Sequence, residues 1–125
     1  MDINLPDIHA EAMAVFARYE VALVLNQIEV LDELFWPSEF TVRFGTGEQL
    51  YGIAAIRAFR QARPAVGLAR MLHHTVITTY GRDFATAMTE FRRTAQASVG
   101  RQSQTWVRMP EGWRVVAAHV SVVPE

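Results

Sequence analysis

The stretch from Gly100 to Ser121 constrains the fold of this chain most, because it predicts two long strands in direct succession. The expected strands are Arg101–Arg108 and Trp113–Val123. A proline and a glycine lie in the turn Met109–Gly112 between them. Proline fixes φ and glycine tolerates positive φ, which suits a tight reversal. Both faces of the second strand are largely apolar, as in a central strand that is covered on both sides.

Polar residues interrupt one face of this second strand near its end. Simple alternation places His119 and Ser121 on the face that begins with Trp113. An apolar face that turns polar is typical of a pocket wall. His119 is therefore either a polar residue whose hydrogen bonds are satisfied on a buried face or a residue that lines a pocket.

The preceding residues predict three helices and four further strands. A long helical pattern follows Asp7, with Phe16, Tyr19 and Leu23 on one face. The other expected elements are helices at Glu29–Leu34 and Ile53–Arg63 and strands at Phe40–Phe44, Glu48–Tyr51, Arg70–Tyr80 and Phe84–Ala97. This order favours one α+β domain, residues 1–125, whose curved antiparallel sheet wraps around a long N-terminal helix and two shorter helices. Such a cone-shaped arrangement encloses a cavity, which commonly holds a ligand.

Charge and composition exclude several classes of function. The cations number 12 against 13 acidic residues, a net charge of −1, so neither nucleic acid nor an anionic membrane is an expected partner. All 12 cations are arginine, which suits bidentate contact with carboxylates, although a GC-rich genome explains the same bias. The chain lacks cysteine, a signal-peptide pattern and an apolar run of the roughly 20 residues that cross a bilayer. A cytoplasmic protein is expected.

No sequence motif indicates metal or cofactor chemistry. His73 and His74 are adjacent on an expected strand, where they point to opposite faces and cannot hold one ion together. The G-x-S-x-G nucleophile elbow and the glycine-rich phosphate loop are both absent. Neither a metal nor an organic cofactor is therefore expected.

A few polar or aromatic residues are candidates for a buried site. Tyr19 is either a core tyrosine or a site residue, because it shares the inner face of the first helix. Arg43 lies on the polar face of its short strand, which fits a solvated arginine, but a strand beside a turn also twists. Arg70 and Arg101 either face inward or pair on the surface. Trp106 is either a core residue or a binding platform.

The order of elements, together with G-W-R-V-V-A-A-H-V-S at 112–121, resembles the nuclear-transport-factor-2-like superfamily. This superfamily includes the SnoaL-like cyclases and ketosteroid isomerase, so the resemblance implies a fold and a pocket rather than one reaction. Four further motifs are similar to the AtzH/HpxZ family: L-Y-G at 50–52, I-R-A-F-R-Q-A-R-P at 56–64, T-V-I-T-T-Y-G at 75–81 and G-R-Q-S-Q-T-W at 100–106.

Resemblance to the AtzH/HpxZ family implies a cytoplasmic bacterial enzyme that is encoded beside an amidase and its small subunit. The implied activity is decarboxylating amidohydrolysis of 1,3-dicarboxyurea to allophanate in cyanuric acid (s-triazine) catabolism, without a cofactor; the HpxZ branch serves oxalurate breakdown. The family's catalytic tyrosine and arginine match Tyr19 and Arg43. A second substrate carboxylate would need a second cation, for which Arg70 or Arg101 is expected. The other residues expected to line the same pocket are Gln104, Trp106 and His119.

Two other functions stay open at this level. One is a non-catalytic small-molecule-binding module or a scaffold for the amidase in oxalurate or ureide nitrogen catabolism. The other is an isomerase or cyclase, which needs an inward acidic base, and Glu90 is the candidate for it. The apolar final strands also predict a homodimer. In the expected helix Ile53–Arg63, the arginines are predicted to point mostly outward.

Overall fold

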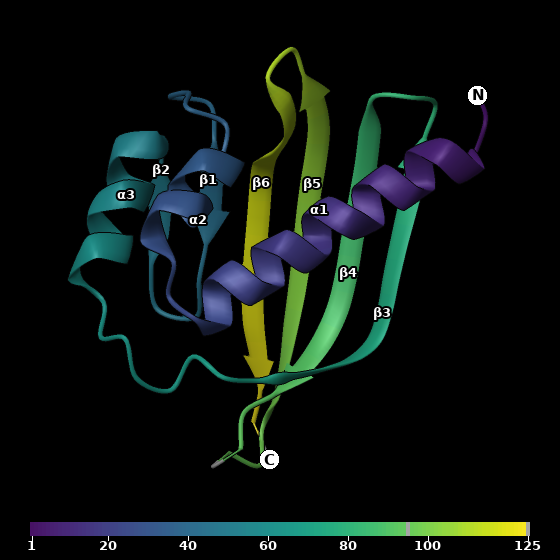
Figure 1. The fold of residues 1–125 in the computed structure, drawn as a ribbon. Coiled ribbons are helices and arrows are strands. Elements are labelled where there is room, and N and C mark those ends of the chain that lie inside the picture. Colours follow the sequence, from purple (N-terminus) through teal and green to yellow (C-terminus); the bar gives the residue numbers. More distant parts are fainter. Residues whose placement is uncertain (95, 125) are drawn as a thin grey trace.

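The computed structural model describes residues 1–94 and 96–124, in which three helices lie on one face of a curved six-stranded sheet (Figure 1). The helices are α1 (Pro6–Val24), α2 (Ile28–Leu34) and α3 (Ile53–Ala62). The strands are β1 (Val42–Phe44), β2 (Gln49–Tyr51), β3 (Met71–Tyr80), β4 (Phe84–Arg92), β5 (Val99–Met109) and β6 (Gly112–Val123). Their order in the sheet is β2-β1-β6-β5-β4-β3. The predicted α+β fold is confirmed.

Most predicted elements begin and end within two residues of the observed ones, but the direction of β1 and the end of β4 differ. The expected sheet was wholly antiparallel, but β1 runs parallel to β6. Its direction is free to differ because no hairpin joins these two strands, whereas β3, β4, β5 and β6 follow one another as antiparallel neighbours. Strand β4 also ends at Arg92, short of the predicted Ala97.

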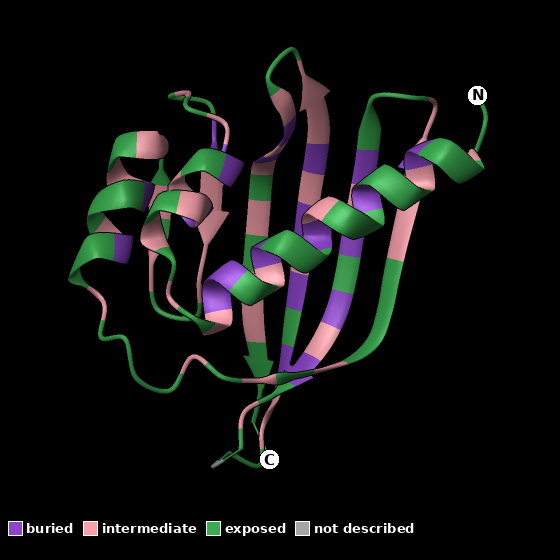
Figure 2. Ribbon diagram, in the orientation of Figure 1, coloured by how far each residue is buried: buried purple, intermediate pink, exposed green. Residues whose placement is uncertain are grey.

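The sheet has one helix-covered face and one helix-free face, which we name so throughout. Helix α1 crosses β3 to β6 diagonally (Figure 1), while α2 packs against β6 and α3 packs against β1 and β2. The buried residues of α1 include Phe16, Tyr19 and Leu23, and Figure 2 shows that its buried side is turned to the sheet. Ala85 and Ala87 of β4 are buried opposite it, and their small side chains allow close packing.

A β-bulge in the final hairpin decides which residues of β6 face the helices. Trp106 pairs with Val115, but Thr105 pairs with Ala117, so Val116 is an extra residue. One extra residue reverses the alternation of every side chain beyond it. As a result, His119 pairs with Ser103 and lies on the helix-free face. The prediction that His119 shares a face with Trp113 is wrong for this reason.

Within residues 1–94 and 96–124, no helix combines the length and apolar character that crossing a membrane requires.

Candidate anion-binding site on the helix-covered face

Tyr19 lies on the side of α1 that packs against the sheet, and its side chain is only 6% exposed. Its ring contacts Phe35 and meets Trp106 of β5 edge-on, with both pairs of ring centres 6.3 Å apart. Trp106 is itself buried. Because aromatic contacts hold the ring, the fold fixes the direction in which the phenol hydroxyl points.

Arg43 points toward the helix-covered face, although it lies on the polar side of β1. Its side chain is 15% exposed, and its Nη1 donates a hydrogen bond of 3.0 Å to Oε2 of Glu48. Its guanidinium carbon lies 5.5 Å from the centre of the Phe59 ring on α3. The apolar side of β1, with Val42 and Phe44, faces the other way, beside a pocket on the helix-free face. Of the two sequence-level interpretations of Arg43, the inward one holds.

Helix α3 brings Arg60 and Arg63 to the same region, and the prediction that they point outward is wrong. They follow Ile53 and Ile56 at spacings of three and four residues, so Arg60 continues the buried stripe of α3, and Arg63 follows at the residue where the helix has ended. Arg60 is buried, and its Nη1 donates a hydrogen bond of 2.5 Å to Oδ1 of Asp32. The sequence contained a signal for this inward orientation, because the spacing of both arginines from Ile53 and Ile56 continues the apolar pattern of α3.

Arg70 and Arg93 are neighbours at the edge of this region. Nε and Nη2 of Arg70 donate to the two carboxylate oxygens of Glu20, at 2.8 and 2.7 Å, and Nη2 also donates to Oε1 of Gln102 at 3.1 Å. Arg93 donates to two loop carbonyls, those of residues 67 and 68. The guanidinium carbons of both arginines lie over the ring of Phe91, at 4.5 and 5.2 Å from its centre. Arg70 is thus already engaged by a carboxylate.

We call these five residues the arginine cluster: Arg43, Arg60, Arg63, Arg70 and Arg93. The carboxylates that neutralise it are Glu20, Asp32 and Glu48, which leaves an excess of two positive charges. Burial lowers the pKa of Arg60, Arg63 and Arg93, while attraction from the Tyr19 phenol opposes that effect at each of them. A partly buried excess of positive charge around one phenol favours the binding of an anion.

Two glutamines of β5 add hydrogen-bond donors to this region. Gln102 and Gln104 are buried on the helix-covered face. Oε1 of Gln104 accepts from Nε1 of Trp106 at 3.0 Å, and Oε1 of Gln102 accepts from Arg70. Since indole and guanidinium groups only donate, each amide oxygen must face its partner. The Nε2 atoms of both glutamines lack a partner among the described residues, as do Nε and Nη2 of Arg63. These four unpaired groups are donors, which suits a ligand rich in acceptor oxygens. Oδ1 of Asn26 and Oγ1 of Thr79 are further buried atoms without a partner among the described residues.

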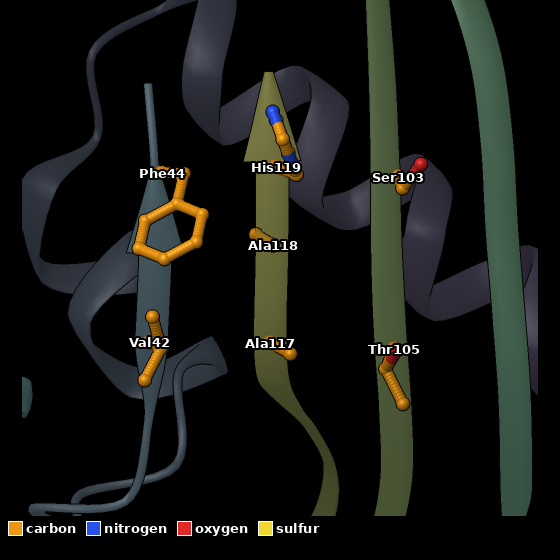
Figure 3. A pocket seen from close by; sticks show the side chains of 7 residues that line it. All are labelled: Val42, Phe44, Ser103, Thr105, Ala117, Ala118 and His119. Atoms are coloured by element: carbon orange, nitrogen blue, oxygen red, sulfur yellow. The ribbon is translucent and has the colours of Figure 1, made fainter. Parts of the chain in front are cut away.

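Two predicted site residues lie elsewhere. Arg101 is exposed on the helix-free face, where its Nε donates to Oγ of Ser121 at 3.2 Å. Figure 3 shows His119 at a shallow pocket on that same face. The prediction that Arg101 and His119 line one pocket with Tyr19 is therefore wrong, since these residues occupy opposite sides of the sheet.

The described residues offer neither the expected acidic base nor a metal centre. Glu90 lies 3.2 Å from Nδ1 of His74 in a pair that is largely exposed. The acids inside the cluster are all paired with arginine. Among residues 1–94 and 96–124, no three His, Asp or Glu side chains gather in a way that would hold a metal ion.

Comparisons with known proteins bear on the family and the fold. The AtzH-like family model matches residues 1–125. A solved protein of unknown function from the DUF3225 family of Pectobacterium atrosepticum is 62% identical, with a TM-score of 0.97 over 98% of this chain and 95% of that one. A cystatin-like fold protein from Burkholderia xenovorans is 50% identical, with a TM-score of 0.95 over 100% and 98% of the two chains.

A less similar solved structure identifies the fold. A nuclear-transport-factor-2-like protein with a cystatin-like fold from Novosphingobium aromaticivorans is 25% identical, with a TM-score of 0.71 over 95% of this chain and 84% of that one. The expected nuclear-transport-factor-2-like fold is thereby confirmed. No curated protein matches the sequence.

Proposed function

The chain belongs to the AtzH-like family, and from that premise we propose that it converts 1,3-dicarboxyurea to allophanate by removing one N-carboxylate. This substrate is a small, flat dianion with a carbonyl at its centre. It therefore presents acceptor oxygens along its whole length and carries two negative charges.

The observation that carries this proposal is the match between the dianion and the arginine cluster. The cluster has two positive charges more than its carboxylates neutralise. The cluster and the two glutamines of β5 together have four buried donor atoms without partners among the described residues, on Arg63, Gln102 and Gln104. A dianion with several oxygens removes the excess charge and the unpaired donors at once.

Tyr19 is the proposed general acid. Breaking the bond between the carboxylate carbon and the nitrogen leaves negative charge on that nitrogen, which is a poor leaving group. Proton transfer from the Tyr19 hydroxyl to the nitrogen would speed this step by about 10²–10⁴-fold. The surrounding guanidinium groups would stabilise the phenolate until it takes a proton back from water. Arg43 would hold a substrate carboxylate in line with Tyr19 and so fix which bond breaks.

Two balanced routes lead to allophanate. In decarboxylation, the C–N bond electrons pass to nitrogen, carbon dioxide leaves, and nitrogen gains the Tyr19 proton. In hydrolysis, water adds to the carboxylate carbon, and the same bond then breaks to give hydrogencarbonate. Both routes consume the proton at the same nitrogen, so Tyr19 has the same role in each.

We place this activity after an amidase that supplies the dicarboxylated urea, in the cytoplasm, and in a homodimer. The family resemblance supports the link to the amidase and its small subunit. Four large apolar side chains on β3 and β4 support the homodimer: Met71, Val76, Phe84 and Met88, each of them exposed. Such a patch on a folded chain is typical of an interface between proteins.

A coupled assay on the purified chain tests the proposal. An amidase generates 1,3-dicarboxyurea in place, and the initial rate of allophanate formation is followed with the wild type, with Arg43→Ala and without the chain. The proposal expects a wild-type rate well above the uncatalysed one and a rate about 10²–10³-fold below wild type for Arg43→Ala. An equal rate with and without the wild-type chain would refute the enzyme and favour a non-catalytic module that associates with the amidase.

A further inference from the structure

Arg63 is the residue on which this inference rests. It caps the C-terminus of α3 with an extended backbone, φ −76° and ψ 146°, because the following Pro64 disfavours a helical conformation. Its guanidinium belongs to the arginine cluster, since Tyr19, Arg60, Arg43 and Arg93 all influence its pKa. Its Nε and Nη2 atoms are shielded from solvent and have no hydrogen-bond partner in residues 1–94 and 96–124.

The other members of the cluster all have partners. Arg43, Arg60 and Arg70 are each paired with a carboxylate. Arg93 donates to two backbone carbonyls. Among the arginines of the cluster, Arg63 is thus the one whose buried donors are unpaired.

The surroundings of Arg63 make this arrangement costly for the folded chain. Burial lowers the pKa of Arg63, and the charges of Arg60, Arg43 and Arg93 act in the same direction, against the attraction of the Tyr19 phenol. A buried charge without a counter-ion is unfavourable. Where a fold retains one, a functional role is the usual reason.

The two unpaired atoms are also the right pair to hold a carboxylate. Nε and Nη2 form one edge of the guanidinium plane, and that edge makes parallel hydrogen bonds to both oxygens of a carboxylate. Arg70 shows this geometry in the same molecule, with Glu20 bound at 2.8 and 2.7 Å. In Arg63 the same edge is vacant of protein partners.

We infer that Arg63 binds the second carboxylate of a dicarboxylate substrate, the one that stays in the product. This inference rests on the proposed function and deepens it, because it replaces Arg70 and Arg101 as the second cation. The substrate then spans Arg43 and Arg63 with its reacting nitrogen beside Tyr19. Binding energy at the remote carboxylate holds the reacting end in place.

Binding of two unreactive acids tests this assignment. Glutarate has the length of 1,3-dicarboxyurea and two carboxylates, whereas butyrate has one. Calorimetric titrations compare both acids on the wild type, on Arg63→Gln and on Arg57→Gln, which changes an exposed arginine of the same helix. The expected result is a glutarate affinity about 10–100-fold lower in Arg63→Gln, with butyrate affinity within about twofold of wild type and no change in Arg57→Gln.

Thermal unfolding of the same proteins separates binding from structure. Without ligand, Arg63→Gln should melt no lower than the wild type, because an unpaired buried charge has been removed. Glutarate should raise the melting temperature of the wild type and not that of Arg63→Gln. A variant that keeps the wild-type preference for glutarate over butyrate would overturn the assignment, and so would a ligand-free loss of stability with no change in binding.

These outcomes are separable from the fate of the proposed reaction, since neither acid is turned over. If glutarate binding depends on Arg63 but the wild type forms no allophanate, the subsite stands and the reaction is wrong. If allophanate forms and Arg63→Gln keeps the wild-type preference for glutarate, the proposed reaction stands and the assignment of Arg63 is wrong.

Discussion

Neighbouring polar residues of β5 differ in burial and in hydrogen bonding, according to which face of the sheet they lie on. Gln102 and Gln104 face the helices, where they are buried and keep donors without partners. Arg101 alternates with them on the helix-free face, where it is exposed and donates to Ser121. Exposed polar groups on the helix-free face can form hydrogen bonds with water, so they need no partner in the protein or in a ligand.

This difference indicates that a binding function lies on the helix-covered face of the sheet. On the helix-covered face, desolvation makes each unpaired donor unfavourable, and the fold retains several of them beside a buried tyrosine. We therefore place the proposed chemistry on the helix-covered face and the proposed dimer contact on the helix-free face. Substitutions on each face test that division.

The largest effect is expected from Tyr19→Phe on the helix-covered face. The change removes the proposed proton donor and keeps the aromatic contacts with Phe35 and Trp106. The rate of allophanate formation should fall about 10²–10⁴-fold with little change in melting temperature. Tyr51→Phe is the matched control, because Tyr51 is 66% exposed. Retained turnover in Tyr19→Phe would remove it as the acid.

The next effect compares one arginine from each face. Arg43→Ala should reduce kcat/KM about 10²–10³-fold, because it removes a charged group that holds the substrate in the reacting position. Arg101→Ala should leave kcat/KM within about twofold, since Arg101 is exposed on the helix-free face, where it donates to Ser121. Steady-state kinetics on both variants decide the matter. A larger loss in Arg101→Ala would reverse the assignment of the two faces.

Met88→Glu tests the role of the helix-free face. Met88 is 49% exposed on β4 and pairs across the sheet with Ser103. A charge there should weaken a homodimer that buries this patch, by about tenfold or more in its dissociation constant. Light scattering at several concentrations measures the change. A wild type that is monomeric at micromolar concentration would contradict the dimer itself.

Glu48→Gln should have a smaller effect, on substrate affinity. Glu48 is the counter-ion of Arg43, so it competes with a substrate carboxylate for the same guanidinium. Its removal should lower KM by a few-fold and leave kcat close to wild type. Glu33→Gln is the control, since Glu33 pairs with Arg18 at an exposed position. A higher KM in Glu48→Gln would mean that Glu48 instead orients Arg43.

The smallest effect concerns a pair outside the site. A hydrogen bond from Arg82 holds the pKa of Asp7 below its ordinary value of 3.8. The stabilisation is therefore present above that value and is lost as the pH falls through the lower, folded pKa. Asp7→Asn should slightly flatten the acid limb of the melting-temperature profile in low salt. An unchanged acid limb would show that this exposed pair contributes nothing measurable.

Much of the fold follows from sequence pattern, because hydrophobic spacing and turn residues specify each element locally. The final hairpin and the inner face of α1, with Phe16, Tyr19 and Leu23, are examples. The direction of β1 beside β6 could not be predicted in this way, since that pairing joins distant parts of the chain.

The site was predictable only in part. Tyr19 could be placed by helical spacing, and Arg43 by family resemblance. His119 was misplaced because a β-bulge leaves no clear mark in the sequence, yet it reverses every later side chain. Arg60 and Arg63 were assigned to the surface because arginine usually lies there, although their spacing from Ile53 and Ile56 pointed inward. For a charged residue that continues an apolar stripe, helical spacing is thus a better guide to orientation than residue type.

The most direct test of the division between the two faces is a crystal structure of the chain with glutarate bound. We expect glutarate to bind on the helix-covered face. One carboxylate should contact Arg43 and the other Nε and Nη2 of Arg63, and the carbon chain should lie beside the Tyr19 hydroxyl. Glutarate bound instead on the helix-free face beside His119, or an arginine cluster left without glutarate at saturating concentration, would contradict this expectation.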